Sequence, residues 1–380
     1  MSTLGTTIGV ITIPLNRSGI VPLTNLIDVL KGNTSQLHLV SGDAGFELYA
    51  NDREVTAHEV RGVAGRNALE KIFNNALTQV RMALHVMRLG RTVDIWILFM
   101  GAETLIIPHI AAKCLRRKTV LLLSGSFLES HAVIGDSTAN AIACASNVSY
   151  MLASDVVVYS KRNIEQWGLE KYSDKIIVSH RHFVDLSEFP MKDRQPDAPI
   201  IGYVGRLSRE KGISNLIEAI PIALSMKNDL RFTIIGDGPL RVEIEEFAAR
   251  KNLRDRVEIL GWVDHDEMAA HLRRMRLLVI PSYTEGLSNV ALEAMASGTP
   301  VLTTGVGGMP DVITDGVTGF ILKDNKPESI AASVVSLADS TELERVVLAA
   351  RRLIETEFTK EVVETRWKTT IRRIQDSRVR

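Results

Sequence analysis

Short runs of β-branched and apolar residues alternate with longer stretches of helical periodicity over almost the whole chain. This alternation predicts βα units on parallel sheets, because parallel strands need a crossover between them that is usually a helix. The runs that predict strands are Ile8–Ile13, Leu37–Val40, Val93–Phe99, Thr119–Leu123, Val156–Tyr159 and Lys175–Val178, then Ile200–Val204, Arg231–Ile235, Val257–Leu260, Leu277–Pro281, Pro300–Thr303 and Gly319–Leu322. The helices predicted in the first half are Ile20–Leu30, Asn67–Leu89, Glu103–Leu115 and Ser137–Leu152. We therefore predict an α/β protein with two doubly wound, Rossmann-like domains.

A polar stretch punctuated by prolines separates the two arrays. Pro190–Pro199 holds three prolines among charged residues and can continue neither a helix nor a sheet. The chain has 380 residues, enough for two domains of ordinary size. We predict an N-terminal domain over residues 1–190 and a C-terminal domain over residues 191–358. From Lys326 onward the pattern is purely helical, so the chain ends in helices.

Charge balance and cysteine usage exclude several classes of protein. Lys plus Arg and Asp plus Glu both number 45, so no net charge draws the chain to nucleic acid. The two cysteines, Cys114 and Cys144, cannot build a disulfide framework and fit a reducing compartment. The opening residues lack the basic segment of a signal peptide, and the most apolar window, Val93–Ala112, carries charged residues that disfavour a membrane span. We expect a soluble, cytoplasmic protein.

The loop after the strand Ile200–Val204 carries candidate ligands for an anion. It begins with Gly205 and contains Arg206 and Lys211. Glycine lets a ligand approach the backbone at the carboxyl end of a parallel strand, where open α/β sheets bind, and two cations there suit a diphosphate. By residue type alone, both could equally be solvated loop charges. Gly236 lies in a second glycine turn, which a tight turn without any ligand explains equally well.

The segment after the strand Leu277–Pro281 carries two glutamates around a predicted helix start. Ser288 or Asn289 can cap a helix whose first N–H groups attract phosphate. Glu285 lies in the loop before this helix and Glu293 lies within it, with seven residues between them. A loop carboxylate can bind sugar hydroxyls, and one on the helix can reach a ribose diol. From spacing alone, both glutamates could also be ordinary solvated charges.

Together these residues resemble the nucleotide-sugar domain of the GT-B retaining glycosyltransferases of the glycogen-synthase-like group, glycosyltransferase family 4 type, which carry a Glu-x7-Glu motif. The matching text is GYVGRLSREKG at Gly202–Gly212, IIGDGPL at Ile234–Leu240, ILGWVDHDEM at Ile259–Met268, PSYTEGLSNVALEAMASGTPVL at Pro281–Leu302 and GVGGMPDVITDGVTGFIL at Gly305–Leu322. The resemblance implies a GT-B architecture, in which two Rossmann-like domains face each other across a cleft. It also implies that residues 359–380 form a helix that crosses back to the N-terminal domain.

The resemblance assigns roles to residues of the second half. Arg206 and Lys211 would hold the donor diphosphate and stabilise the departing nucleotide, and Glu285 would lie at the donor sugar, so that these three residues would be catalytic. Glu293 would bind the ribose hydroxyls. Further donor-binding positions would be Gly19, Gly205, Gly236, Trp262, Val263, Gly286, Leu287 and Ser288. No metal or other cofactor is implied, since the nucleotide sugar is a substrate.

The first half departs from the family pattern at two places. Family members usually carry two glycines in the loop after the first strand, and here Gly19 alone remains. They often place a histidine after the fourth predicted strand, where this chain has Ser-Gly-Ser. We take Ser124, Ser126 and the nearby His131 as candidates for the acceptor side, although a lone histidine is more often a surface residue. His109, on a predicted helix, is expected to be packed.

Two basic clusters allow two interpretations. One comprises Lys113, Arg116, Arg117 and Lys118, and the other is the tail Arg366–Arg380, with six basic residues against one acid. In the first interpretation they are solvated or brace the fold. In the second they contact anionic lipid at the cytoplasmic membrane face, or a lipid-phosphate acceptor.

The sequence thus predicts an enzyme that transfers a sugar, with retention and without a metal, from a nucleotide sugar to a hydroxyl of a saccharide, lipid-linked or small-molecule acceptor. A catalytically silent relative that serves as a partner subunit is one alternative, which the Ser-Gly-Ser site favours and the intact Arg206, Lys211, Glu285 and Glu293 oppose. A nucleotide-sugar epimerase of similar shape is another, although the text around Glu293 resembles transferases more closely. These residues determine neither the base, the sugar nor the oligomeric state.

Overall fold

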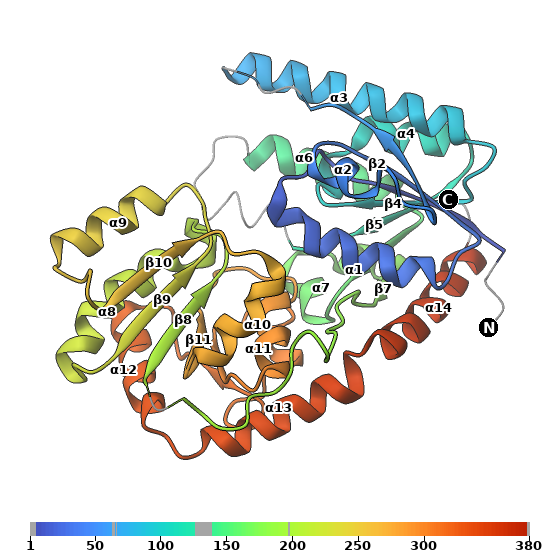
Figure 1. Cartoon of the computed structure of the whole chain (residues 1–380). Helices are drawn as coiled ribbons and strands as arrows, with labels where there is room; N and C mark the ends of the chain where they lie inside the picture. The colour runs from blue at the N-terminus through green and yellow to red at the C-terminus, as the bar shows by residue number, and fades with distance from the viewer. Residues whose placement is uncertain (1–4, 63–64, 66, 126–138, 197, 378–380) are drawn as a thin grey trace. The chain divides into compact units, whose positions relative to one another are not determined.

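The computed structural model describes residues 5–62, 65, 67–125, 139–196 and 198–377. They form two compact units, the first made of Met1–His182 with Val363–Arg380 and the second of Phe183–Val362. Each unit is built on one parallel sheet with helices packed on its faces (Figure 1). The predicted pair of doubly wound, Rossmann-like domains with a helical C-terminus is confirmed.

The first unit contains a seven-stranded parallel sheet in the order β3-β2-β1-β4-β5-β6-β7. Its strands are β1 (Thr7–Ile11), β2 (Gln36–Ser41), β3 (Val55–Glu59), β4 (Ile95–Phe99), β5 (Lys118–Leu122), β6 (Asp155–Val158) and β7 (Ile176–Val178). Its helices are α1 (Ile20–Lys31), α2 (Ala44–Tyr49), α3 (Ala68–Leu89), α4 (Ile106–Cys114), α6 (Ala139–Leu152), α7 (Arg162–Gln166) and most of α14 (Lys360–Asp376). Helix α1 lies on one face of the sheet, and α3 and α4 lie on the other (Figure 1).

A glycine lets the central strands of this sheet carry a tryptophan. Gly9 on β1 is the register partner of Trp96 on β4. A Cβ atom at Gly9 would lie 2.4 Å from the Trp96 ring, closer than any real contact. The indole therefore packs against β1 only because that position has no side chain, and it is fully buried in the core of the unit.

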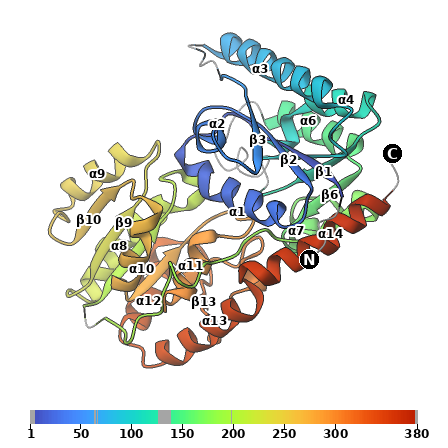
Figure 2. The same cartoon turned by 45° about the vertical axis from the view of Figure 1, so that its right-hand side comes forward.

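Four elements of the first unit differ from the sequence-based expectation. One is the five-residue helix α7, which was not predicted because it is too short to show a helical period. The edge strand β3 was not predicted, because only Val55 of its residues is buried and an edge strand lacks the apolar run of a central one (Figure 2). The six-residue helix α2 is too short to show a helical period. The helix predicted over Glu103–Leu115 begins instead as a 3₁₀ turn at Ala102–Thr104, and α4 follows after Leu105, whose backbone is not helical.

The second unit contains a six-stranded parallel sheet in the order β10-β9-β8-β11-β12-β13. Its strands are β8 (Ile200–Val204), β9 (Arg231–Ile235), β10 (Val257–Gly261), β11 (Leu277–Ile280), β12 (Val301–Thr303) and β13 (Phe320–Ile321). Its helices are α8 (Ile213–Met226), α9 (Arg241–Arg250), α10 (His265–Arg274), α11 (Asn289–Ala296), α12 (Pro327–Ala338) and α13 (Leu343–Glu357). The aliphatic side chains of β8, β9 and β11 and of α8 and α12 form its core.

The division between the units falls earlier than the proline-rich stretch. Residues 183–190, which the sequence places in the first domain, belong to the second unit. The backbone N–H of Val184 donates to the carbonyl of Phe358 at 2.8 Å, and the carbonyl of Phe189 accepts from Arg351 Nη1 at 3.1 Å. These bonds hold the segment on the end of α13, a tertiary contact that the local sequence does not reveal.

The last helix belongs to the first unit from Val363 onward. Trp367 is fully buried and donates from Nε1 to the carbonyl of His180 at 2.9 Å. At the other end of α14, Lys118 Nζ donates to backbone carbonyls that include that of Ile374, at 2.6 Å. A cation at a helix C-terminus also interacts favourably with the helix dipole. The C-terminal segment is therefore an integral part of the first unit.

We predict that Trp367→Ala lowers the free energy of unfolding by about 3–5 kcal/mol, because it leaves a large cavity and an unpaired carbonyl. Arg372→Ala, at an exposed position of the same helix, is the matched control and should change stability by less than about 0.5 kcal/mol. Urea unfolding followed by circular dichroism measures both variants. Equal midpoints would contradict the packing role of Trp367.

Candidate functional site

The carboxyl ends of β8, β9 and β11 bring three loops of the second unit together. The N–H of Gly205 donates to Ile235 O at 3.0 Å, and that of Leu207 donates to Asp237 O at 2.9 Å. The loop after β11 joins them, since Tyr283 N donates to the carbonyl of Glu210 at 2.9 Å. The backbones of the predicted phosphate loop and of the segment with Glu285 are thus hydrogen-bonded to each other.

Two glycines make this close approach of the loops possible. Gly236 has a φ of +131°, and a Cβ atom there would lie 1.9 Å from the carbonyl oxygen of Gly205. Gly307 has a φ of +58°, and a Cβ atom there would lie 1.6 Å from the carbonyl oxygen of Glu285. Only glycine combines such a backbone with such a contact. The glycine turn at Gly236, for which the sequence left two explanations open, therefore has a structural role in the site.

Glu285 is held by two donors. Its carboxylate is about nine-tenths buried, and its Oε1 accepts hydrogen bonds from Lys211 Nζ and from Ser282 Oγ, each at 2.8 Å. The Lys211 side chain is 30% exposed, so one side of the ion pair is open to solvent while the carboxylate is buried. A buried carboxylate is tolerated when a cation and a hydrogen bond compensate it. The structure thus brings together Lys211 and Glu285, two of the three predicted catalytic residues.

Arg206, the third of these residues, is exposed. Within the described residues its guanidinium has no hydrogen-bond or ion-pair partner. Its backbone is fixed, because the buried Tyr203 hydroxyl donates to the carbonyl of Arg206 at 2.8 Å. Burial raises the pKa of Tyr203 well above its usual value, and the nearby carboxylates of Glu285 and Glu210 raise it further. Tyr203 therefore stays a neutral donor, while Arg206 remains free to bind an anion.

Glu293 lies on α11 and pairs with a histidine. The helix begins after Ser288, whose Oγ accepts from the N–H of Ala291, as the sequence predicts for a cap. Glu293 is buried, and its Oε1 lies 3.1 Å from His265 Nε2 at the start of α10. The hydrogen bond to Glu293 raises the pKa of His265, with an opposing effect of burial. His265 thus orients Glu293 when no ligand is bound.

The other predicted donor residues divide between the two units. Trp262 and Val263 follow β10, and Trp262 is 43% exposed with its Nε1 3.2 Å from Asp264 Oδ1. Gly286, Leu287 and Ser288 are buried immediately before α11. Gly19, also a predicted donor residue, belongs to the first unit, where it precedes α1. Of the candidates for the acceptor side, Ser124 follows β5 in the same unit. Ser126 and His131 lie outside the described residues.

His109 is packed, as expected: it is fully buried with Nε2 2.9 Å from Thr119 Oγ1, and burial lowers its pKa to about 3.

The sequence did not single out three residues of this site. Ser282 and Gly307 act on Glu285, and His265 acts on Glu293. His265 and Gly307 come from segments distant in the chain from the glutamates that they contact. Ser282 lies three residues before Glu285, but only the fold determines that its hydroxyl points toward the carboxylate. The only indication in the sequence that these three residues belong to the site was that all of them lie in the segments that resemble the family. Across the described ranges, no three His, Cys, Asp or Glu side chains gather to hold a metal ion, and metal independence stays a prediction.

In sequence, the similarity to known proteins lies mainly in the second unit. Residues 187–352 match the family model described as Glycosyl transferases group 1. Over 147 residues the chain is 37% identical to alpha-D-kanosaminyltransferase of Streptomyces kanamyceticus, covering 39% of this chain and 38% of that protein. Over 189 residues it is 32% identical to glycogen synthase of Mycobacterium tuberculosis, covering 49% and 45%. The chain thus spans less than half the length of these curated relatives.

Solved structures match the chain over nearly its full length. The crystal structure of Anabaena Alr3699/HepE in complex with UDP-glucose superimposes with a TM-score of 0.76 at 18% identity, covering 97% of this chain and 99% of that one. Sucrose-phosphate synthase from Thermosynechococcus elongatus gives a TM-score of 0.74 at 20% identity, with coverage of 97% and 99%. The chain has the GT-B fold. Among the described residues, no helix combines the length and the apolar character needed to cross a membrane.

The His265–Glu293 pair predicts a pH-dependent contribution to stability. Because the pKa of His265 is raised above its usual 6.5, the folded protein binds this proton more tightly than the unfolded chain does. The stabilisation is complete below pH 6.5 and is lost as the pH rises through the raised pKa. We expect His265→Gln to lower the free energy of unfolding at acidic pH more than at alkaline pH, by less than about 1 kcal/mol because the imidazole is partly exposed.

Thermal melts at pH values between about 5.5 and 8.5 measure this effect. His271→Gln, on the same helix, is the matched control for loss of an imidazole. The difference between wild type and the His265 variant should shrink as the pH rises. A constant difference, or the same trend in the control variant, would rule out the pair as its source.

Proposed function

We propose that the protein is a glycosyltransferase that moves a sugar from a nucleotide-sugar donor to a hydroxyl of an acceptor. The observation that carries this proposal is the pairing of Lys211 with the buried carboxylate of Glu285, in a unit that matches the group 1 glycosyltransferases. The full-length likeness to structures that contain UDP and UDP-glucose supports a nucleotide sugar as the donor. Uridine nucleotides are therefore the first donors to test.

We assign the donor diphosphate to Arg206 and Lys211. The Lys211 ammonium has three N–H donors, and Glu285 uses one of them. The other two can bind phosphate oxygens, so one lysine would link the diphosphate to the carboxylate at the donor sugar. Arg206 is exposed at the end of the same loop and adds a second cation. These charges would stabilise the departing nucleoside diphosphate, a role that a metal fills in other enzymes.

Glu293 is proposed to bind the ribose hydroxyls of the donor. Its carboxylate accepts a hydrogen bond from His265, so the ribose would share or replace that hydrogen bond. Trp262 and Val263 follow β10 at the same edge of the sheet and would contact the base. The amides of Gly286, Leu287 and Ser288 would add donors to the phosphates at the start of α11.

We propose transfer with retention of configuration. The bond between the anomeric carbon and the phosphate oxygen would break as a bond to the acceptor oxygen forms on the same face of the sugar. The acceptor proton would pass to the departing phosphate oxygen, so no protein nucleophile is required. Glu285 would stabilise the positive charge that develops on the sugar ring. Most of the rate enhancement would then come from positioning and electrostatics.

The acceptor is proposed to be a saccharide, a lipid-linked sugar or a small molecule that presents a hydroxyl. Ser124, after β5 in the first unit, is the described candidate for its binding. We place the reaction in the cytoplasm, where Cys114 and Cys144, both free and exposed, would stay reduced. The ordered contacts of Lys211 and Glu285 support an enzyme over a silent partner subunit.

Donor turnover in the presence of EDTA tests the proposal. We expect the purified protein to hydrolyse or transfer sugar from a nucleotide sugar at an undiminished rate in the chelator, and NMR of the first product to show the anomeric configuration of the donor. Loss of activity restored by manganese or magnesium would contradict the role of Arg206 and Lys211. An inverted product would contradict retention, an epimerised donor would indicate an epimerase, and no turnover of any donor would favour a silent subunit.

Separate substitutions of the two glutamates should give different kinetic effects. Glu285→Ala should lower kcat steeply and leave the affinity for free nucleoside diphosphate within a few-fold, because the carboxylate acts on the reacting sugar. Glu293→Ala should raise the donor KM by roughly tenfold to a hundredfold, as expected from a lost hydrogen bond to a charged group worth about 1.5–3 kcal/mol.

Steady-state kinetics and calorimetry with the diphosphate alone measure these effects. Glu258→Ala, at an exposed position of β10, is the matched control and should leave both quantities unchanged. Loss of diphosphate binding in Glu285→Ala, with binding intact in Glu293→Ala, would reverse the two assignments.

A further inference from the structure

Helix α3 of the first unit carries apolar side chains on two opposite faces. On its inner face, Met82 and Val86 are fully buried in the core. On the opposite face large apolar side chains are exposed, by 67% at Phe73, 43% at Val80, 42% at Leu84 and 52% at Met87. A surface helix usually buries one apolar face and presents polar residues on the other. The second apolar face of α3 is therefore unusual.

The exposed residues form a continuous row along the helix. Phe73, Leu77, Val80, Leu84 and Met87 follow one another at intervals of four, three, four and three residues. At 3.6 residues per turn these positions fall on one line, about 21 Å long at 1.5 Å per residue. We call these five side chains the outer stripe.

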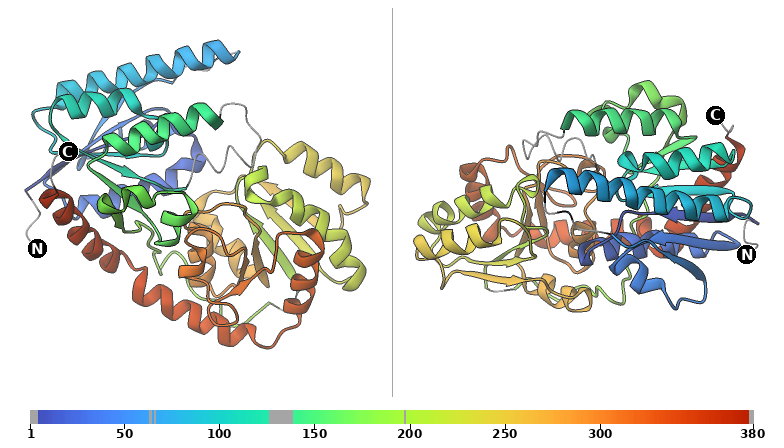
Figure 3. Two further views of the ribbon diagram at one scale, coloured as in Figure 1. Left: turned by 180° about the vertical axis from the view of Figure 1, so that it is seen from behind. Right: turned by 90° about the horizontal axis from the view of Figure 1, so that it is seen from above.

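No described element of the first unit covers the outer stripe. Helix α3 runs along the outside of that unit, with α4 at its side (Figure 3). Four of the five side chains of the stripe are exposed by more than two-fifths. Single exposed apolar residues are ordinary on a protein surface, but a contiguous row of them marks an interaction surface.

Basic residues border the outer stripe. Arg81 and Arg88 lie along one side of it, and Arg91 follows its last turn. Glu70 is the single acidic residue in the sequence of α3. If two copies packed stripe against stripe in parallel, Arg81 and Arg88 of one copy would lie beside the same arginines of the other and repel them. An anionic bilayer attracts the same arginines and takes up apolar side chains at the depth of its headgroups.

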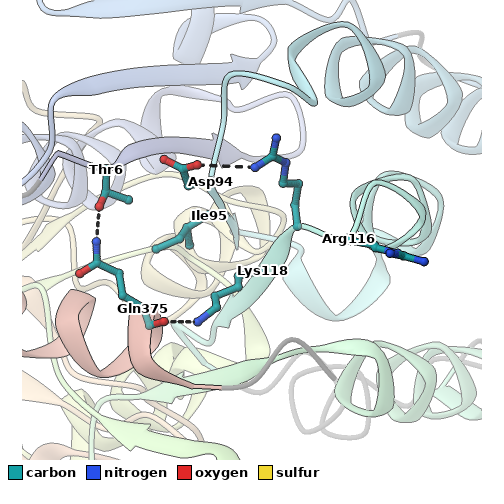
Figure 4. Close-up of a pocket in the computed structure, with 7 residues that line it drawn as sticks. Thr6, Asp94, Ile95, Arg116, Lys118 and Gln375 are labelled. Carbon is teal, nitrogen blue, oxygen red and sulfur yellow. Dashed lines mark hydrogen bonds and ion pairs between the residues drawn. The ribbon is translucent and has the colours of Figure 1, made fainter.

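Arg116, the exposed residue of the predicted basic cluster, lies near the C-terminal end of α3. Arg117 Nε donates to the carbonyl of Gly90, directly after the helix, at 2.6 Å. Leu115 also packs there, since a Cβ atom at Gly90 would lie 2.5 Å from it. The turn between α4 and β5 is thus joined to the end of α3. Arg116 in this turn is exposed, and its side chain points away from Asp94 (Figure 4).

The rest of that cluster is engaged within the fold. Arg117 and Lys118 line a pocket of about 390 Å³ (Figure 4). Arg117 lies 3.5 Å from Asp94, Lys118 binds the end of α14, and Gln375 donates to Thr6. The polar groups of this pocket already bind one another. For Arg117 and Lys118 the bracing interpretation therefore holds, and the outer stripe is the better candidate for a lipid contact.

We propose that the outer stripe of α3, with Arg88, Arg91 and Arg116, is the surface through which this protein binds an anionic membrane. Helix α3 would lie in the plane of the interface with the side chains of the stripe among the acyl chains and headgroups. The arginines would contact lipid phosphates at its C-terminal end. This binding is peripheral and reversible, and it does not depend on the proposed enzymatic activity.

Co-sedimentation with vesicles tests the proposal. The probes are vesicles of phosphatidylcholine alone and vesicles of equal parts phosphatidylcholine and phosphatidylglycerol. The double variant Phe73→Ser, Leu84→Ser removes two apolar residues of the stripe, and Arg88→Gln, Arg91→Gln removes two charges. The matched control is Val242→Ser, Leu348→Ser, at two apolar positions of the second unit that are exposed by 65% and 54%.

We expect the full chain to bind the anionic vesicles, and added salt to weaken that binding. The stripe variant and the arginine variant should each bind them at least tenfold more weakly, while the control variant and the melting temperatures of all variants stay close to wild type. Absence of binding by wild type, or equal binding by the stripe and control variants, would overturn the proposal. A dimer in sedimentation velocity that the stripe variant dissociates would assign the surface to a second copy instead. Donor turnover without vesicle binding would likewise overturn it and leave the proposed function intact.

Discussion

The burial of the Glu285 carboxylate governs the arrangement of the second unit at the carboxyl edge of its sheet. A buried negative charge is costly unless a cation and a hydrogen bond compensate it, and here Lys211 and Ser282 do so on one oxygen. These donors come from the ends of the neighbouring strands β8 and β11. Gly236 and Gly307 have no side chain, which allows the backbones of the loops to come close enough for this contact. The site is therefore a consequence of strand order and of two glycines.

The two glutamates of the motif lie in different electrostatic surroundings. Glu285 is paired with Lys211, whereas Glu293 is paired with His265, whose charge depends on pH. The first carboxylate is held in one place by the protein. The second has a partner whose hold weakens as the imidazole loses its proton. We proposed above that the first carboxylate acts at the reacting sugar and the second at the ribose, roles in which a fixed group and an adaptable group would be useful.

Two helices of the first unit, α14 and α3, differ in how they pack on its sheet. Its C-terminal helix α14 is joined to the sheet by the buried Trp367 and by Lys118 at the helix end. On the other face of the sheet, α3 buries Met82 in the core and exposes Phe73 and Leu84. The residues of the predicted basic cluster thus do not share one role. Lys118 braces the fold, and Arg116 remains at the surface.

The sequence by itself determined the fold class and singled out Lys211, Glu285 and Glu293, because strand and helix periodicity and the residues within each short motif are local properties. It could not determine which atoms these residues contact. The tertiary structure decided that His265 meets Glu293 and that residues 183–190 belong with the second unit, since both follow from contacts between segments distant in the chain. The tertiary structure also decided that the outer face of α3 is exposed. A helix with apolar residues on two faces has the same sequence pattern whether one face or both are buried, so the sequence alone does not distinguish the two cases.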